Sequence, residues 1–331
     1  MRIAIPASLA LMLLTMPLLA APAHAQAAAH PDLSGVWDAD FITPLERPDG
    51  VADLIVPPEK AAEVVAKATD KPTGVYDPDA DFFFPDKLLS VRGELRSSML
   101  IEPHDGHLPF TALGKAINAA HEDSWQTDFD NPEDRPASER CLASLGHPPI
   151  HAISLEIPVE IVATPAAIAI TTEDTDSTRI IDMTGRRPPS VIRTRAGYSS
   201  GRWEGDTLVV ETTHIAATDP SGVVFRDNVM LTENSRVIER FTLLSANELL
   251  YQFSVEDPAL YDRPWLAEFV FKRHDDRLYE YACHEGNFGM KNILTAARLG
   301  KQKPPKKDDK KPDPKTATLK PDTKKSNGQK P

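Results

Sequence analysis

Several common catalytic motifs are missing from this sequence. The chain has two cysteines among its 331 residues and no Cys-x-x-Cys, which argues against a thiol redox protein. It has no Gly-x-Ser-x-Gly elbow, no P-loop and no Gly-x-Gly-x-x-Gly after a strand, which argues against serine hydrolases and nucleotide enzymes. It has no His-Glu-x-x-His, so a zincin site is excluded. We therefore expect neither a cofactor nor a metal.

A long hydrophobic run is missing after the first 20 residues. No later segment approaches the roughly 18 continuous apolar residues of a membrane-spanning helix, so we expect no transmembrane segment in the mature chain. At the start, Arg2 precedes an apolar stretch from Ile3 to Ala20, and Ala23-His24-Ala25 forms a small-x-small cleavage site. This pattern predicts a signal peptide over residues 1–25 and a periplasmic or secreted mature protein.

Basic residues are scarce except at one end of the chain. The formal net charge is −12, and eleven lysines and four aspartates place +7 on residues 301–331. Without these residues and without Arg2, the mature body carries −20. A body this acidic argues against nucleic-acid binding, which needs a basic face for the phosphates.

The basic end itself is rich in lysine and proline and nearly free of apolar side chains. Such a composition cannot bury a core, so residues 301–331 are expected to be disordered. Two interpretations stay open. The tail makes weak contacts with anionic envelope components, or it is a solvated extension without a role.

Between residues 26 and 300 the pattern predicts a single β-rich domain with helical decoration near its N-terminus. Short helices are expected at Glu59–Ala68, Thr111–Ala120 and Asn292–Leu299, the second with Thr111 as its N-cap. From residue 153 onward the chain turns to short strands of alternating polarity. The expected strands are Val159–Val162, Ala167–Thr171, Arg179–Met183, Tyr198–Trp203, Thr207–Thr213, Asn234–Leu244, Glu248–Val255, Trp265–Arg273 and Leu278–Cys283.

Tight turns join most of these strands, as at Glu204-Gly205-Asp206, so neighbouring strands are expected to pair antiparallel. Such a meander closes into a barrel or splits into a sandwich, because closure removes exposed edges. The predicted fold class is therefore mainly β, an antiparallel meander closing into a lipocalin-like barrel, with a β-sandwich as the alternative. Gly35-Val36-Trp37 resembles the Gly-x-Trp that opens lipocalin-like barrels and favours the barrel.

Export would place the two cysteines in an oxidising compartment. In an oxidising compartment a pair of cysteines usually forms a disulfide, so we expect a bond between Cys141 and Cys283. It would close a loop of over 140 residues and stabilise the fold by about 4–5 kcal/mol in the chain-entropy model. The alternative is two buried, unpaired thiols.

The stretch from Tyr279 to Asn287 combines alternating tyrosines, a cysteine and a His-Glu pair. The alternation predicts that this stretch begins in the strand that closes the barrel. His284 and Glu285 are candidates for general acid–base chemistry. Adjacent residues on a strand point to opposite faces, so the turn at Gly286 would have to bring the two side chains together. A structural role, with His284 bonded across the sheet and Glu285 capping the next turn or helix, fits them nearly as well.

Two further carboxylates complete the candidate catalytic set. Glu204 lies in a predicted hairpin turn, where it could flank a ligand together with Asp206. Asp257 follows a predicted strand and precedes Pro258, so it could face the same mouth of the barrel as His284. Each also has a plain role in making its turn.

Aromatic side chains supply the candidate ligand-binding residues. In the predicted strands they alternate with polar ones, which would direct them into the barrel. Small barrels of about eight strands can hold one small ligand. The candidates are Trp203, Tyr251, Phe253, Tyr279 and Tyr281; a place in the core is the alternative for each.

Longer motifs resemble those of a large, poorly characterised family of exported bacterial proteins. The motifs are Asp32-Leu33-Ser34-Gly35-Val36-Trp37, Gly201-Arg202-Trp203-Glu204-Gly205-Asp206-Thr207-Leu208-Val209-Val210-Glu211-Thr212-Thr213, Val255-Glu256-Asp257-Pro258 with Pro264-Trp265, and Glu280-Tyr281-Ala282-Cys283-His284-Glu285-Gly286-Asn287. The resemblance covers Pro31 to Arg298. It implies export and a single β-rich unit, and it implies no particular reaction.

Three functions follow as hypotheses. The first is an exported barrel that binds a small apolar or aromatic ligand in its interior. The second is a cofactor-free periplasmic lyase, isomerase or hydrolase that uses His284 with nearby carboxylates. The third is an envelope interaction protein that acts through its basic tail.

Overall fold

The structure, a computed structural model, describes most of the chain between residues 30 and 302. The predicted signal peptide and residues 303–331 of the basic tail lie outside the described residues. The described ranges are 30–68, 87–127, 129–135, 139–142, 146–150, 158–173, 177–217, 222–226 and 229–302.

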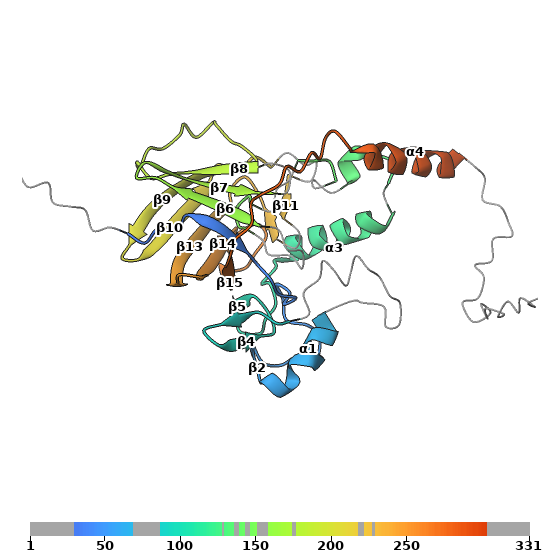
Figure 1. Ribbon diagram of the computed structural model, residues 1–331. Coiled ribbons are helices and arrows are strands. Elements are labelled where there is room, and N and C mark those ends of the chain that lie inside the picture. Colours follow the sequence, from blue (N-terminus) through green and yellow to red (C-terminus); the bar gives the residue numbers. More distant parts are fainter. Residues whose placement is uncertain are drawn as a thin grey trace, which may run out of the picture.

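Nine strands form a closed barrel (Figure 1). The ring closes where β1 pairs with β15, with Val36 opposite His274. Closure confirms the predicted barrel and excludes the sandwich. In ring order the strands are β1 (Gly35–Asp38), β6 (Val159–Ala163), β7 (Ala167–Thr172), β8 (Ser177–Asp182), β9 (Tyr198–Glu204), β10 (Thr207–Thr213), β13 (Arg236–Ser245), β14 (Glu248–Glu256) and β15 (Trp265–His274).

One neighbouring pair in the ring is parallel, whereas the turns predicted an antiparallel meander. β8 and β9 run the same way, with Ile181 opposite Ser199. The reason is the connection between them. The end of β8 lies directly beside the start of β9, so residues 183–197 form a long loop that returns to the same level, and β9 then continues in the direction of β8.

Strand polarity follows the predicted alternation. In β14 the side chains of Leu249, Tyr251, Phe253 and Val255 are fully buried. Alternate residues share one face of a strand, and this face of β14 forms part of the main apolar core. The β9–β10 hairpin is also as predicted, because Glu204 pairs with Thr207 across a two-residue turn.

Segments inserted between the barrel strands form smaller units. β2 (Ile55–Val56), β3 (Ser90–Val91) and β4 (Glu94–Arg96) make a three-stranded sheet, and β11 (Val224–Arg226) pairs with β12 (Val229–Leu231). β5 (Leu100–Glu102) extends the barrel sheet beside β15. The helical segments are η1 (Pro58–Lys60), α1 (Ala61–Ala68), α3 (Ala112–Thr127), η2 (Pro132–Asp134) and α4 (Phe288–Gln302).

Helix positions match the sequence predictions, with shifted ends. α3 begins where Thr111 Oγ1 accepts the amide of Gly114 at 3.0 Å, so the predicted N-cap is confirmed. α1 places Val64 in a second, small apolar cluster with Ile42, Val56 and Leu88. None of the helices that the structure describes is both long and apolar enough to cross a membrane.

The predicted closing strand at Leu278–Cys283 is wrong. This stretch has no strand structure, and Tyr279 and Tyr281 are 72% and 52% exposed. β15 is the closing strand, and β1 already occupies its edge. A further strand therefore has no edge to pair with, and the chain leaves the sheet after His274.

The disulfide between Cys141 and Cys283 is confirmed. It ties the chain after β15 to the short turn around Cys141. Asn287 adds a hydrogen bond from Nδ2 to the Glu139 carbonyl at 2.8 Å, and its Oδ1 accepts the amide of Met290 in the first turn of α4. The cysteine pair thus fixes the start of the last helix.

The disulfide predicts a clear loss of stability when the bond is reduced or removed. The double variant Cys141→Ser/Cys283→Ser should lose about 2–5 kcal/mol of unfolding free energy, because the unfolded chain regains the freedom of a large loop. Urea denaturation followed by tryptophan fluorescence measures this. Dithiothreitol should shift the midpoint of the natural sequence and leave that of the double variant unchanged. Equal midpoints for the two oxidised proteins would contradict the expectation.

Candidate functional site

Glu204 lies at the outer tip of the β9–β10 hairpin. Its carboxylate accepts hydrogen bonds from Arg202 Nη2 at 2.6 Å and Arg240 Nη2 at 3.0 Å. These hydrogen bonds hold the pKa of Glu204 below its usual range. The side chain is exposed and paired with two guanidinium groups, so it acts as the centre of a surface ion-pair cluster.

Asp257 lies at the opposite end of the barrel and is buried. Its Oδ2 accepts hydrogen bonds from Thr232 Oγ1 at 2.7 Å and from Ser235 Oγ at 2.5 Å, and its Oδ1 accepts the amide of Ala259 at 3.0 Å. These bonds join the loop after β14 to the loop before β13, which is a structural task.

The structure does not bring Glu204 and Asp257 together. Across the sheet, Glu204 pairs with Thr207, Thr207 with Thr242, and Thr242 with Leu250. The Glu204 turn is therefore level with Leu250 of β14. From there to Asp257 the strand continues for seven residues, roughly 20 Å at the usual rise. An acid–base site that uses both carboxylates is therefore not formed.

His284 and Glu285 lie in the turn after Cys283, and both are exposed. Neither side chain has a hydrogen bond or an ion pair with another residue in the described part of the chain. The helix cap predicted for Glu285 is supplied by Asn287 instead. As acid–base candidates these two residues stay a prediction.

The five candidate ligand residues fall in three places. Tyr251 and Phe253 are fully buried inside the barrel. Trp203 is half-buried and stacks on His30 with ring centroids 4.6 Å apart. Tyr279 and Tyr281 are exposed, outside the barrel.

The aromatic side chains inside the barrel pack against one another. The ring of Tyr251 lies 4.9 to 5.9 Å from those of Phe241, Phe253, Phe269 and Phe271. All five are at most 2% exposed. This part of the interior is therefore filled by side chains, and a ligand would need space elsewhere.

A buried ion pair lies next to this aromatic group. Arg179 of β8 donates from Nη1 to Glu239 Oε2 at 2.6 Å and from Nη2 to Oε1 at 2.9 Å. The Tyr251 hydroxyl donates to Glu239 Oε1 at 2.8 Å. The side chains of the ion pair are 2% and 0% exposed. We call Arg179, Glu239 and Tyr251 the buried polar cluster.

Electrostatics fix the protonation of the buried polar cluster. Burial, reinforced by the charge of Glu239, raises the pKa of Tyr251 well above its usual value, so the phenol keeps its proton. Burial lowers the pKa of Arg179, and the attraction of Glu239 more than offsets this, so that the pKa is raised. The cluster therefore presents a protonated phenol and a charged guanidinium whose Nε has no hydrogen bond among the described residues.

The sequence analysis missed this cluster, although one signal was present. Glu239 occupies the same face of its strand as Val237 and Phe241, and Arg179 shares a face with Ile181. A charged residue at an inward position of a predicted strand needs a buried partner. With two such residues of opposite sign, pairing across the barrel was a possible inference.

Residues Gly146–Ile150 cover the cluster. The amide of Ile150 donates to the Tyr251 hydroxyl at 2.8 Å. His147 Nε2 is 3.0 Å from Ser177 Oγ, two residues before Arg179 on β8. The Ile150 side chain is buried and belongs to the main core. We call this five-residue segment the cover loop.

Chemically, the cluster can bind and orient a polar group. The Nε of Arg179 is a hydrogen-bond donor, whereas the Tyr251 hydroxyl, which gives its proton to Glu239, can accept a hydrogen bond from a bound group. A metal has no evident site, because the described residues contain no group of three or more His, Cys, Asp or Glu side chains that could hold one.

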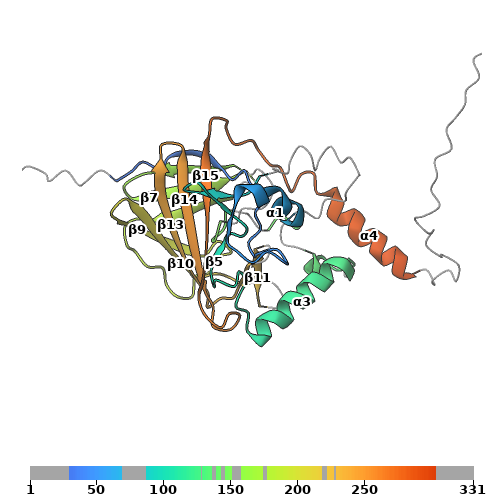
Figure 2. The ribbon, with the colours of Figure 1, turned by 90° about the horizontal axis from the view of Figure 1, so that it is seen from below.

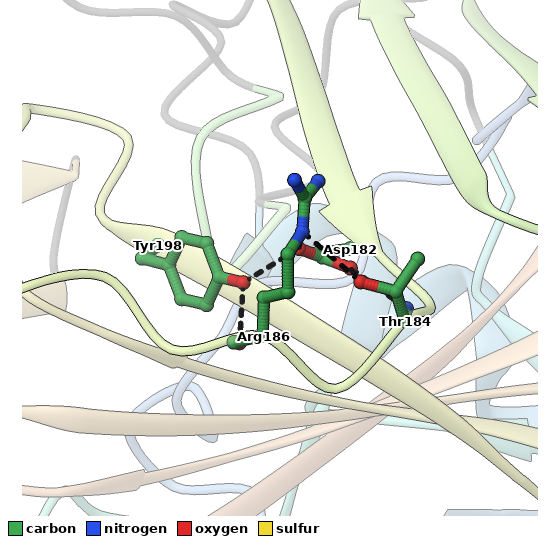
Figure 3. A network of polar contacts seen from close by, with 4 residues as sticks. All are labelled: Asp182, Thr184, Arg186 and Tyr198. Carbon is green, nitrogen blue, oxygen red and sulfur yellow. Dashed lines mark hydrogen bonds and ion pairs between the residues drawn. The ribbon is translucent and has the colours of Figure 1, made fainter.

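A second polar network lies outside the barrel (Figure 3). Asp182 accepts hydrogen bonds from the Thr184 side chain at 2.6 Å, the Thr184 amide at 2.7 Å and the Tyr198 hydroxyl at 2.8 Å. Arg186 Nε lies 3.2 Å away. The network joins the end of β8 to the start of β9, so it fixes the connection that makes this pair parallel.

Comparison with protein-family models and with curated proteins gave no match. The resemblance to exported bacterial proteins therefore stays a prediction, and the argument about function depends on the geometry.

The buried ion pair predicts unequal costs for two carboxylate variants. Glu239→Gln should lose about 3–5 kcal/mol of unfolding free energy, because it leaves Arg179 charged and poorly paired in the interior. Glu204→Gln, which breaks an exposed cluster, should change stability little. Urea denaturation of both variants and of Arg179→Met/Glu239→Leu measures this. The double variant should lose less than Glu239→Gln; an equal or larger loss would contradict the assignment.

The Asp182 network predicts a dependence of stability on pH. Hydrogen bonds, chiefly from Thr184, hold the pKa of Asp182 below its unfolded value. The carboxylate therefore stabilises the fold fully above about pH 5, and this contribution is lost progressively as the pH falls further. Asp182→Asn should lower the melting temperature at neutral pH, and its difference from the natural sequence should shrink in acid. A constant difference would contradict the network's role.

Proposed function

We propose that the protein is an exported barrel that binds a small apolar or aromatic ligand carrying one polar group. The binding site is the end of the barrel beneath the cover loop, with the polar group at the buried polar cluster. A single observation carries the proposal: a charged pair and a phenol lie buried in an otherwise apolar interior, directly under a short loop.

The energetics support a functional reason for the buried pair. Apolar residues of similar volume usually stabilise an interior as well as a buried ion pair does, or better. A pair at this position therefore suggests a task beyond stability. Strongly shifted pKa values in an interior also accompany functional sites, and Tyr251 has such a shift.

The aromatic packing limits where a ligand can lie. Because the rings around Tyr251 are in contact, space has to come from movement of the cover loop. Ile150 of the cover loop makes the two contacts that a ligand would replace. The Ile150 side chain packs in the core, and the Ile150 amide donates a hydrogen bond to the Tyr251 hydroxyl. A ligand with an apolar body and a hydroxyl group reproduces both contacts, because the hydroxyl can donate to Tyr251 as the Ile150 amide does. The same hydroxyl could accept a hydrogen bond from the Nε of Arg179.

Export is supported by two features. The first 25 residues have the pattern of a signal peptide, and the two cysteines form a disulfide, as is usual in oxidising compartments. The enzyme hypothesis has less support, because two of its four candidate residues lie at opposite ends of the barrel.

The ligand proposal predicts that Tyr251→Phe weakens binding about tenfold, equivalent to the loss of one buried hydrogen bond. Native mass spectrometry of protein purified from its own host should show bound mass that is released on unfolding. Binding of 8-anilinonaphthalene-1-sulfonate, which has an aromatic body and an N–H donor, compares the variants by fluorescence.

Tyr261→Phe is the matched control. Its hydroxyl is also buried, and it hydrogen-bonds the backbone of Met230 at 3.0 and 3.1 Å. The control should lose similar stability without losing affinity for the probe. Ligand-free protein from the host, together with equal probe binding by all three proteins, would overturn the proposal.

A further inference from the structure

Exposed apolar side chains gather in the chain after β15. We call residues 275–302 the C-terminal arm. Its Tyr279, Tyr281, Phe288 and Leu299 are 72%, 52%, 70% and 53% exposed. Large apolar side chains that are exposed together indicate an interaction surface.

The exposure occurs in a segment that is held in place. The arm is fixed by the disulfide at Cys283, by Tyr279, whose amide donates to Glu173 Oε2 at 3.0 Å, and by Arg298, whose Nε donates to the Asp130 carbonyl at 2.8 Å. Figures 1 and 2 both show α4 lying away from the barrel, on the same side as α3. The aromatic side chains are thus presented outward by a fixed backbone.

The charge of the arm changes sign along the chain. Residues 275–287 contain four acidic and one basic residue, whereas α4 contains Lys291, Arg298 and Lys301 and no acidic residue. From Phe288 to the end, thirteen basic and four acidic residues give +9, which leaves −21 on residues 1–287. The basic charge therefore begins at α4 and continues into the tail.

We propose that α4, with Phe288 at its start and Tyr281 in the segment before it, binds the surface of an anionic phospholipid bilayer. Aromatic rings favour the headgroup region of a membrane. A helix with basic and apolar residues lies in the interface and binds anionic lipids, and the following lysines add attraction to the negative surface. The acidic barrel is repelled by that surface, which would orient the protein with the arm toward the lipid.

This proposal is independent of the ligand site. It differs from a role for the tail alone, because it assigns contact with the lipid to described residues of the arm. Other possible binding partners of the arm would recognise it by a different chemistry. An anionic polysaccharide would attract the lysines and gain little from the aromatic rings, and the acidic barrel could attract the tail within one molecule.

Vesicle co-sedimentation of the full mature chain tests the proposal. Binding should be strong to vesicles of phosphatidylcholine with phosphatidylglycerol and weak to phosphatidylcholine alone, and it should fall as salt is raised. Tyr281→Ser/Phe288→Ser should weaken binding to the anionic vesicles by at least about tenfold, because two apolar contacts are lost.

The matched control is Ile180→Ser/Val191→Ser, which removes two apolar side chains that are 57% and 86% exposed elsewhere on the surface. It should bind like the natural sequence. A chain ending at Gln302 should bind more weakly and less salt-sensitively, yet still lose affinity on Tyr281→Ser/Phe288→Ser.

Three results would overturn the proposal. These are no sedimentation with anionic vesicles, equal loss in the arm and control variants, and binding to an anionic polysaccharide with none to vesicles. Circular dichroism of each variant shows whether a loss of binding has its origin in misfolding.

Discussion

Closure of the barrel depends on one four-residue strand. β1 pairs with β6 on one side and with β15 on the other, so the ring is complete only while Gly35–Asp38 stays in register. Arg273 secures this strand: its guanidinium lies 4.2 Å from the Trp37 ring centroid, and its Nη1 donates to the Ser34 carbonyl at 3.1 Å. Gly35 makes room, because a Cβ there would lie 2.2 Å from Arg273 Nη1, and its φ of +140° suits glycine. The Gly-x-Trp pattern thus has a physical role in closing the ring.

Strand positions could be predicted because most barrel strands alternate between a filled interior and the outside. β14 shows this well from Tyr251 onward, where buried apolar residues alternate with Gln252 and Ser254. In the β9–β10 hairpin the sequence signal was the turn at Gly205. Tyr279 and Tyr281 show the same alternation, yet they form no strand. Local pattern gives no information on whether a sheet edge is still free, and here β1 had taken it. The buried polar cluster was missed for a related reason, since Arg179 and Glu239 are 60 residues apart in the chain.

The two ends of the barrel are built differently, and this decides where binding is possible. At one end, Glu204 belongs to an exposed cluster of ion pairs on a tight hairpin. At the other end, Asp257 is buried and joins two loops through hydrogen bonds. The cover loop closes over the buried polar cluster. A tight hairpin holds its turn through strand pairing, whereas the cover loop is held by hydrogen bonds to Tyr251 and Ser177 and by the buried Ile150 side chain. Residues that bind a ligand are therefore expected beneath the cover loop.

The ligand site and the C-terminal arm are connected through Cys141. This residue lies five positions before Gly146, where the cover loop begins, and its disulfide holds the start of the arm at Cys283. The outward tyrosines and the cover loop are thus attached to the same short stretch of chain. A surface that holds the arm would therefore act on a segment next to the covered end of the barrel. An apolar ligand partitions into lipid, so an arm that binds a bilayer would bring the covered end close to the phase in which such a ligand is most concentrated. The two proposals remain separate in their tests, but the disulfide gives them a common structural basis.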